Sequence, residues 1–208
     1  PCYGIEPTQN TALAARKKGI EIIEEFFNSE KAKELALDGR QADVIIANNV
    51  LAHVPDINDF VRGFSMLLKS DGIATFEFPH LLNLVRFNQF DTIYHEHHSY
   101  LSLTTTEKIF SLNGLNIFKV EKLLTHGGSL RVFAQRIDSG KRIIEDSVER
   151  MIIEEFRNGI TTLSFYEGFQ KKANIVKDNF VSFVSEIENR GEEVVGYGAS
   201  ANGNTLFN

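Results

Sequence analysis

The 208-residue sequence is poor in cysteine, tryptophan and proline, with one, none and four, respectively. A single cysteine, Cys2, excludes an internal disulfide framework and is typical of a protein from the reducing cytosol. No apolar run approaches the roughly 18 residues that a membrane helix needs, and no signal peptide is visible. Basic residues are outnumbered, 22 against 28 acidic ones, and phosphate binding needs a basic face. We therefore predict a cytoplasmic protein with neither a nucleic-acid nor a membrane partner.

The residues that are present suit a globular domain, since 42% are hydrophobic and 24% are charged. The length allows one full α/β domain and part of another. The sequence begins with Pro1, and residues 2–5 already look like the end of a strand. The segment from Gly196 to Asn208 is a glycine-rich turn with nothing after it. We therefore expect both ends to have been cut from something longer.

Strand-like and helix-like segments alternate over the first 135 residues, the pattern of a mostly parallel sheet with helices on both faces. Ser29 and Asn58 are the expected N-caps of two of these helices. The expected strands are 2–6, 20–27, 43–49, 73–78, 115–121 and 129–136, and the expected helices are 8–18, 29–39, the one beginning at 58, and 105–113. Residues 79–102 form a long irregular stretch of about 24 residues, which is usually functional, and hold four of the six histidines.

The sequence after Arg142 is helical in pattern. Its apolar residues form one stripe at a spacing of three to four residues, which indicates core far more often than a cofactor site. The stripe consists of Phe165, Phe169, Val176, Phe180, Phe183, Val184 and Ile187. A strand leading into a glycine turn is then expected from Glu193. We therefore divide the chain into a first α/β domain (1–138), a helical linker (139–190) and the beginning of a second α/β domain (191–208).

Three polar positions follow expected strands, where ligands of α/β folds bind. Glu6 could accept hydrogen bonds from the two hydroxyls of a ribose, or it could be a solvated carboxylate. The glycine-rich turn that normally lies about 20 residues upstream of such an acid is absent. Asn48 could line a cofactor pocket or satisfy the next loop, and His53 could be a packed core histidine.

The densest chemical motif is Tyr94-His95-Glu96-His97-His98, which is costly to bury without a purpose. Histidine and glutamate are zinc ligands, but adjacent histidines do not make the helical metal motif with ligands four residues apart. An acid–base site fits better, with a neutral imidazole as base and Tyr or His donors for an oxyanion. A polar surface loop remains the plain alternative.

Two glycine-containing turns complete the candidate residues. His126-Gly127-Gly128-Ser129 permits close backbone approach, so either a ligand phosphate or a tight turn fits it. The segment from Gly196 to Gly203 resembles a phosphate-binding turn but departs from the G-x-G-x-x-G spacing.

These motifs occur in an order similar to that of the nucleotide-sugar C-methyltransferases, which are class I methyltransferases dependent on S-adenosylmethionine. The resemblance covers essentially the whole chain. It is carried by 4–7 (Gly-Ile-Glu-Pro), 47–56, 91–97 with Tyr-His-Glu-His, 126–132 with His-Gly-Gly-Ser, and 196–199.

This resemblance implies a three-part protein with a zinc-binding N-terminal domain, a central Rossmann-like cofactor domain and a C-terminal α/β domain. The sequence would then begin after the first strand and glycine loop of the central domain, so the sheet is incomplete. On this reading we expect residues 1–208 alone to be inactive. The zinc cysteines are absent, so we expect no metal on these residues.

The resemblance also implies site roles. His97 is the expected base in forming an enolate from a nucleotide-linked 4-keto-deoxysugar, aided by Tyr94, Glu96 and His53. Residues expected to bind S-adenosylmethionine are Glu6, Pro7, Phe26, Phe27 and Asn48, and those expected to bind substrate are His126, Gly127, Tyr197 and Gly198. An O- or N-methyltransferase of a small metabolite and a non-catalytic metal-binding module remain open alternatives.

Overall fold

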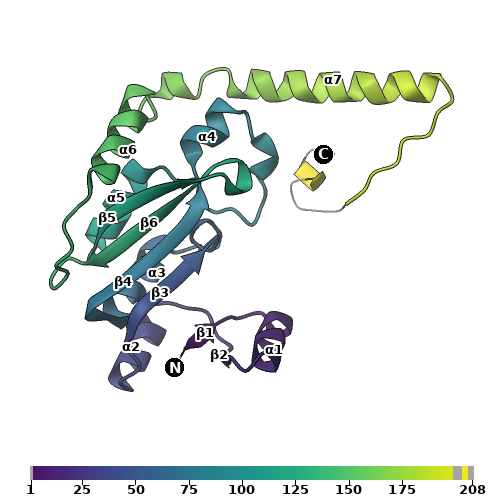
Figure 1. Ribbon diagram of the computed structural model, residues 1–208. Coiled ribbons are helices and arrows are strands. Elements are labelled where there is room, and N and C mark those ends of the chain that lie inside the picture. The colour runs from purple at the N-terminus through teal and green to yellow at the C-terminus, as the bar shows by residue number, and fades with distance from the viewer. Residues whose placement is uncertain (1, 199–202, 206–208) are drawn as a thin grey trace.

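The computed structural model describes residues 2–198 and 203–205 and has an α/β fold, as expected (Figure 1). The strands are β1 (Tyr3–Ile5), β2 (Glu21–Ile23), β3 (Ala42–Asn48), β4 (Leu68–Pro79), β5 (Leu115–Leu123) and β6 (Ser129–Arg136). The α-helices are α1 (Gln9–Lys17), α2 (Ser29–Leu37), α3 (Ile57–Leu67), α4 (Leu81–Arg86), α5 (Leu103–Leu112), α6 (Asp146–Arg157) and α7 (Phe169–Asn189). Short 3₁₀ turns are η1 (Leu51–His53), η2 (Phe90–Thr92), η3 (Thr125–Gly127) and η4 (Leu163–Phe165).

The strands form two separate hydrogen-bonded sheets. β1 pairs with β2 in parallel, and the larger sheet has the order β3-β4-β6-β5. Only β3 and β4 are parallel in the larger sheet, because β6 runs antiparallel to both of its neighbours. The expectation of a mostly parallel sheet is therefore wrong, and the sheet is mixed. Local sequence patterns do not determine strand direction, which depends on how the long connections return.

The main core lies between one face of the larger sheet and helices α3, α5 and α6. Phe76 of β4 is fully buried in this core, and its ring centroid lies 4.5 Å from that of Phe64 and 4.7 Å from that of Phe110. On the opposite face of β3, Val44 and Ile46 are 52% and 66% exposed. Within residues 2–198, the second helical layer that we expected is therefore missing over β3, since α1 packs against β2 instead.

Both expected N-caps lie too late in the sequence. The cap of α2 is Asn28, whose side chain accepts from the Lys31 amide (2.8 Å). The cap of α3 is Asp56, whose carboxylate accepts from the Asp59 amide (2.9 Å). Ser29 cannot cap because its hydroxyl instead donates to the carboxylate of Asp59. The structure thus shows which of several adjacent polar residues satisfies the free helix amides.

Strand β2 ends at Ile23 and is shorter than expected, because residues 24–28 are irregular. Phe27 enters the core there, with its ring 5.5 Å from that of Phe60 and 5.2 Å from that of Phe64, both edge-on. The expected turn at 69–72 is instead a bulge within β4, where Ala42 pairs with Leu68 and Val44 with Ile73.

The stretch from Pro79 to Ser102 is more ordered than expected, since it contains α4 and η2. The apolar stripe on α7 is not core, because no residue of this helix is buried by the described residues. Figure 1 shows α7 running away from the sheet. Residues 192–198 do not form the expected strand, and 199–202 of the glycine-containing turn lie outside the described residues. No described helix combines the length and apolar content needed to cross a bilayer.

Candidate active site

The candidate site is built around a tight turn after η2. The His97 amide donates to the Tyr94 carbonyl (3.0 Å), which closes a four-residue turn. This turn brings the Tyr94 hydroxyl to 3.0 Å from His97 Nε2, with ring centroids 4.2 Å apart. In an extended strand these two side chains would point to opposite faces. The irregular backbone that their convergence requires is therefore present.

The hydrogen bonds of His97 determine its tautomer. Its Nδ1 lies 2.9 Å from the Thr92 carbonyl oxygen, which can only accept, so Nδ1 carries the proton. The lone pair is therefore on Nε2, where the Tyr94 hydroxyl donates. Burial lowers the pKa of His97, although the Thr92 hydrogen bond opposes this, which favours the neutral ring. Burial, helped by the charge of Glu96, raises the pKa of Tyr94 and keeps its proton in place. The pair thus combines a neutral base and a protonated donor.

His53 joins this pair from η1. Its ring centroid is 4.7 Å from that of His97, and its Nδ1 donates to the Glu96 carbonyl (3.0 Å). The Ala52 carbonyl accepts the His98 amide (2.8 Å), which fixes the turn against η1. His53 is half-buried in this contact, so it is not a fully packed core histidine.

The remaining members of the motif face outward. The side chains of Glu96, His95 and His98 are exposed, and Glu96 enters the cluster through its carbonyl oxygen. Among residues 2–198 and 203–205, no group of three or more His, Cys, Asp or Glu is arranged to hold a metal ion.

The expected cofactor residues divide into those that fit and one that does not. Glu6 follows β1, and one carboxylate oxygen accepts the Thr8 amide (2.8 Å). Asn48 is exposed at the carboxyl end of β3, Pro7 is exposed after β1, and Phe26 is 77% exposed after β2. These positions all lie at or just after the carboxyl ends of strands, where α/β folds bind ligands. Phe27 does not fit, because its ring packs into the core.

The His126-Gly127 turn adopts positive φ at three successive positions, with Gly128 the third. The Gln89 amide donates to the Gly127 carbonyl (2.8 Å), and a Cβ on Gly127 would collide with that side chain. The glycines thus allow close packing on the histidine-bearing loop. His126 itself is exposed.

The two remaining substrate-binding candidates are not brought to the cluster. Tyr197 is fully exposed, and Gly198 is an exposed residue in irregular chain beside the undescribed positions.

A surface groove of about 770 Å³ lies at the amino-terminal ends of the larger sheet's parallel strands, lined among others by Leu37, Met66 and Leu112. It contains no candidate residue.

Sequence reasoning missed a buried carboxylate at the carboxyl ends of β3 and β4. Glu77 of β4 is 5% exposed and bonds Arg131 (2.8 Å) and the Thr125 hydroxyl (3.0 Å). It is in register with Asn48 on one side and Arg131 on the other. The available signal was a charged residue between two apolar ones, Phe76 and Phe78.

The fold is similar to that of a solved methyltransferase. A crystal structure of an S-adenosylmethionine-dependent methyltransferase from Thermotoga maritima, described as a possible histamine N-methyltransferase, matches with a TM-score of 0.50 at 13% identity. The match covers 64% of this chain and 72% of that one. The alternating architecture is thus that of the class I methyltransferases.

The chain belongs to the S-adenosylmethionine-dependent methyltransferase family. Residues 1–120 match the family described as a methyltransferase domain, and residues 124–208 match the C-methyltransferase C-terminal domain. The C-methyltransferase NovU of Streptomyces niveus is 34% identical over 204 residues, which are 98% of this chain and 48% of the relative. The ubiquinone biosynthesis O-methyltransferase of Salmonella paratyphi A is 34% identical over 73 residues, 35% of this chain and 29% of that relative. The chain spans less than half the length of either curated relative.

Proposed function

We propose that this chain is part of a C-methyltransferase that methylates a nucleotide-linked 4-keto-deoxysugar through an enolate. The similarity to NovU and to the C-methyltransferase C-terminal domain supports carbon as the acceptor. The division into a cofactor domain (1–138), a helical linker (139–190) and the beginning of a second α/β domain (191–208) is part of this proposal.

The observation that carries the proposal is the hydrogen bond from His97 Nδ1 to the Thr92 carbonyl (2.9 Å). It leaves Nε2 with the lone pair, and it can stabilise the imidazolium that forms when Nε2 takes a proton. A ketone acidifies the proton on its neighbouring carbon, so a neutral imidazole can remove it. A positioned base of this kind typically contributes about 10²–10⁴-fold in rate.

The Tyr94 hydroxyl has a second task in this scheme. In the free protein it donates to His97 Nε2, so a substrate C–H bond must displace it before proton transfer. The displaced hydroxyl can then donate to the enolate oxygen, and one such donor is typically worth about 3–4 kcal/mol of barrier. His53, against the other side of the imidazole, is placed to position the substrate or to share the oxyanion.

The chain's own cofactor residues suit S-adenosylmethionine, which supplies the electrophilic methyl group when bound. Glu6 has a second carboxylate oxygen beyond the one that accepts the Thr8 amide, and it can accept from ribose hydroxyls. The exposed ring of Phe26 can cover an adenine, and Asn48 can contact the methionine end. Among the substrate residues, His126 and Gly127 remain candidates.

Hydrogen–deuterium exchange of the substrate tests the proposal. The intact protein, given a nucleotide-linked 4-keto-deoxysugar in D₂O with S-adenosylhomocysteine in place of the methyl donor, should exchange the proton next to the ketone. An O- or N-methyltransferase would bind a substrate and transfer the methyl group without any such exchange. If methylation occurs on oxygen or nitrogen with no carbon-bound exchange, the enolate proposal is wrong. Metal analysis of the purified domain separates the C-methyltransferase and the O- or N-methyltransferase hypotheses from that of a metal-binding module.

A further inference from the structure

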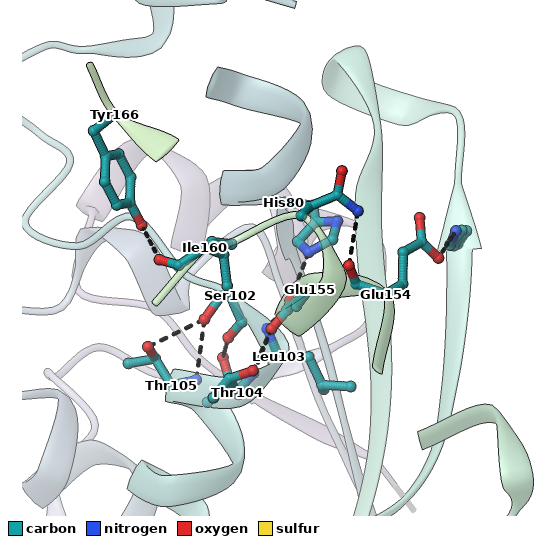
Figure 2. A network of polar contacts seen from close by, with 12 residues as sticks. His80, Ser102, Leu103, Thr104, Thr105, Glu154, Glu155, Ile160 and Tyr166 are labelled. Atoms are coloured by element: carbon teal, nitrogen blue, oxygen red, sulfur yellow. Dashed lines mark hydrogen bonds and ion pairs between the residues drawn. The ribbon is translucent and has the colours of Figure 1, made fainter. Parts of the chain in front are cut away.

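A second buried carboxylate lies on α6, outside the residues assigned above. Glu155 is fully buried and accepts four hydrogen bonds (Figure 2). One oxygen accepts from His80 Nε2 (2.7 Å) and from the Leu103 amide (2.6 Å). The other accepts from the amide and hydroxyl of Thr104, at 2.8 and 2.6 Å. Every donor comes from a residue at least 51 positions away in the sequence.

The donors mark the two ends of the loop that carries the proposed catalytic pair. His80 is the N-cap of α4, at the beginning of the loop, and Leu103 opens α5, just after its end. The backbone joins the ends at the same place, since the Leu81 amide donates to the Leu101 carbonyl (2.9 Å). The His80 amide also donates to the Gly128 carbonyl (3.1 Å) of the glycine turn. One carboxylate thus closes the base of the loop.

The electrostatic environment keeps this carboxylate charged. Burial alone would raise the pKa of Glu155, but the hydrogen bonds from His80, Thr104 and Leu103 together lower it below the ordinary value. The amides of Leu103 and Thr104 belong to the first turn of α5, where the helix dipole favours an anion. A neutral replacement would leave at least one buried donor without its acceptor.

The neighbouring glutamate has none of these contacts. Glu154 points outward and pairs with Lys122 at 2.6 Å, with about a third of its side chain exposed. The two adjacent residues therefore provide a matched comparison on one helix.

We infer that Glu155 is a positioning residue, whose carboxylate fixes both ends of the loop so that Tyr94 and His97 stay in contact. The inference rests on the proposed function for the role of that pair. It also gives the segment matched to the C-methyltransferase C-terminal domain a direct role in the site, because α6 lies within residues 124–208.

The test replaces Glu155 with Gln in the intact protein, with Glu154→Gln as the matched control. Thr104→Val, which removes one donating hydroxyl at nearly constant shape, is the second variant if Glu155→Gln yields no folded protein. Met151→Ala removes a buried apolar side chain of the same helix that takes no part in the hydrogen bonds of Glu155, and it controls for simple destabilisation. The readouts are amide exchange at His97 and His98, and the rate of substrate α-proton exchange in folded protein.

We expect loop amides in Glu155→Gln to exchange about tenfold faster or more, because a charge-assisted anchor is lost. The turnover number for α-proton exchange should fall by about 10²-fold with S-adenosylmethionine affinity unchanged. Glu154→Gln and Met151→Ala should leave the loop amides and the turnover number as in the wild type. Unchanged loop amides in a folded Glu155→Gln or Thr104→Val protein would overturn the inference, whatever the activity. Faster loop amides with unchanged α-proton exchange would support the loop anchor but refute its role in positioning Tyr94 and His97.

Discussion

Replacement of His97 by Asn isolates the proposed base from the rest of the site. The Asn amide nitrogen can take the place of Nδ1 and donate to the Thr92 carbonyl, which now lies 2.9 Å from Nδ1. No atom of Asn takes the place of Nε2, which lies 3.0 Å from the Tyr94 hydroxyl. The turn should therefore persist, since its own closing bond is between backbone atoms, while the lone pair that accepts the proton is lost.

The expected magnitudes differ between stability and rate. Losing the hydrogen bond with Tyr94 should cost about 0.5–1.5 kcal/mol of unfolding free energy, because that hydroxyl is only partly buried. Losing a positioned base should slow α-proton exchange by about 10²–10⁴-fold, which is about 3–5 kcal/mol of barrier. The chemical effect should thus far exceed the structural one.

The assay follows loss of the substrate α-proton into D₂O by NMR, with S-adenosylmethionine affinity measured separately by calorimetry. His95→Asn and His98→Asn are the controls, since both side chains are exposed, and each should retain nearly the wild-type rate. Wild-type exchange in the His97→Asn protein would refute the reasoning and make His53 the next base to test. Loss of cofactor binding together with exchange would show that the residue supports the fold rather than the chemistry.

Four further predictions use the same protein. Glu6→Ala should weaken S-adenosylmethionine binding by about 1–3 kcal/mol in calorimetry, and unchanged affinity would remove Glu6 from the site. Phe27→Ala should lower the unfolding free energy by about 3 kcal/mol, because its ring packs in the core. Phe26→Ala should instead weaken cofactor binding at nearly constant unfolding free energy, because its ring is exposed. The reverse pattern would contradict both placements. Because burial lowers the pKa of His97 from 6.5, the rate of α-proton exchange should rise with pH through that lowered pKa and stay level above pH 6.5. A rise in rate centred above pH 6.5 would show that another group titrates. The pKa of Glu155 lies below 4.5 in the folded state, so the charged carboxylate stabilises the fold fully above that pH, and this stabilisation is lost as pH falls through the folded pKa. The unfolding free energy of Glu155→Gln should therefore fall less steeply with decreasing pH than that of the wild type. Equal steepness would contradict the charged carboxylate.

Several features of the fold followed from local sequence patterns. The helix over 9–17 ends before Gly19, which has φ 80°, and β6 has the predicted bounds, 129–136. The motif from Tyr94 to His98 also identified the loop in which Tyr94 and His97 meet. These features depend on residues within a few positions of one another, so spacing, glycine punctuation and motif density are enough to predict them.

Other features needed the tertiary structure, because they depend on contacts between distant segments. Strand direction in the mixed sheet, the entry of Phe27 into the core and the exposure of α7 each depend on what packs nearby. Glu155 is the clearest example. It stands beside Glu154 in a helix, and nothing local separates the two, yet only Glu155 reaches the first turn of α5, which lies about 50 residues earlier in the sequence. The sequence by itself determined most of the strands and helices before α6 and where the reactive side chains gather. Only the folded chain decided which carboxylate is buried and what it anchors, because burial and hydrogen bonding depend on neighbours in space.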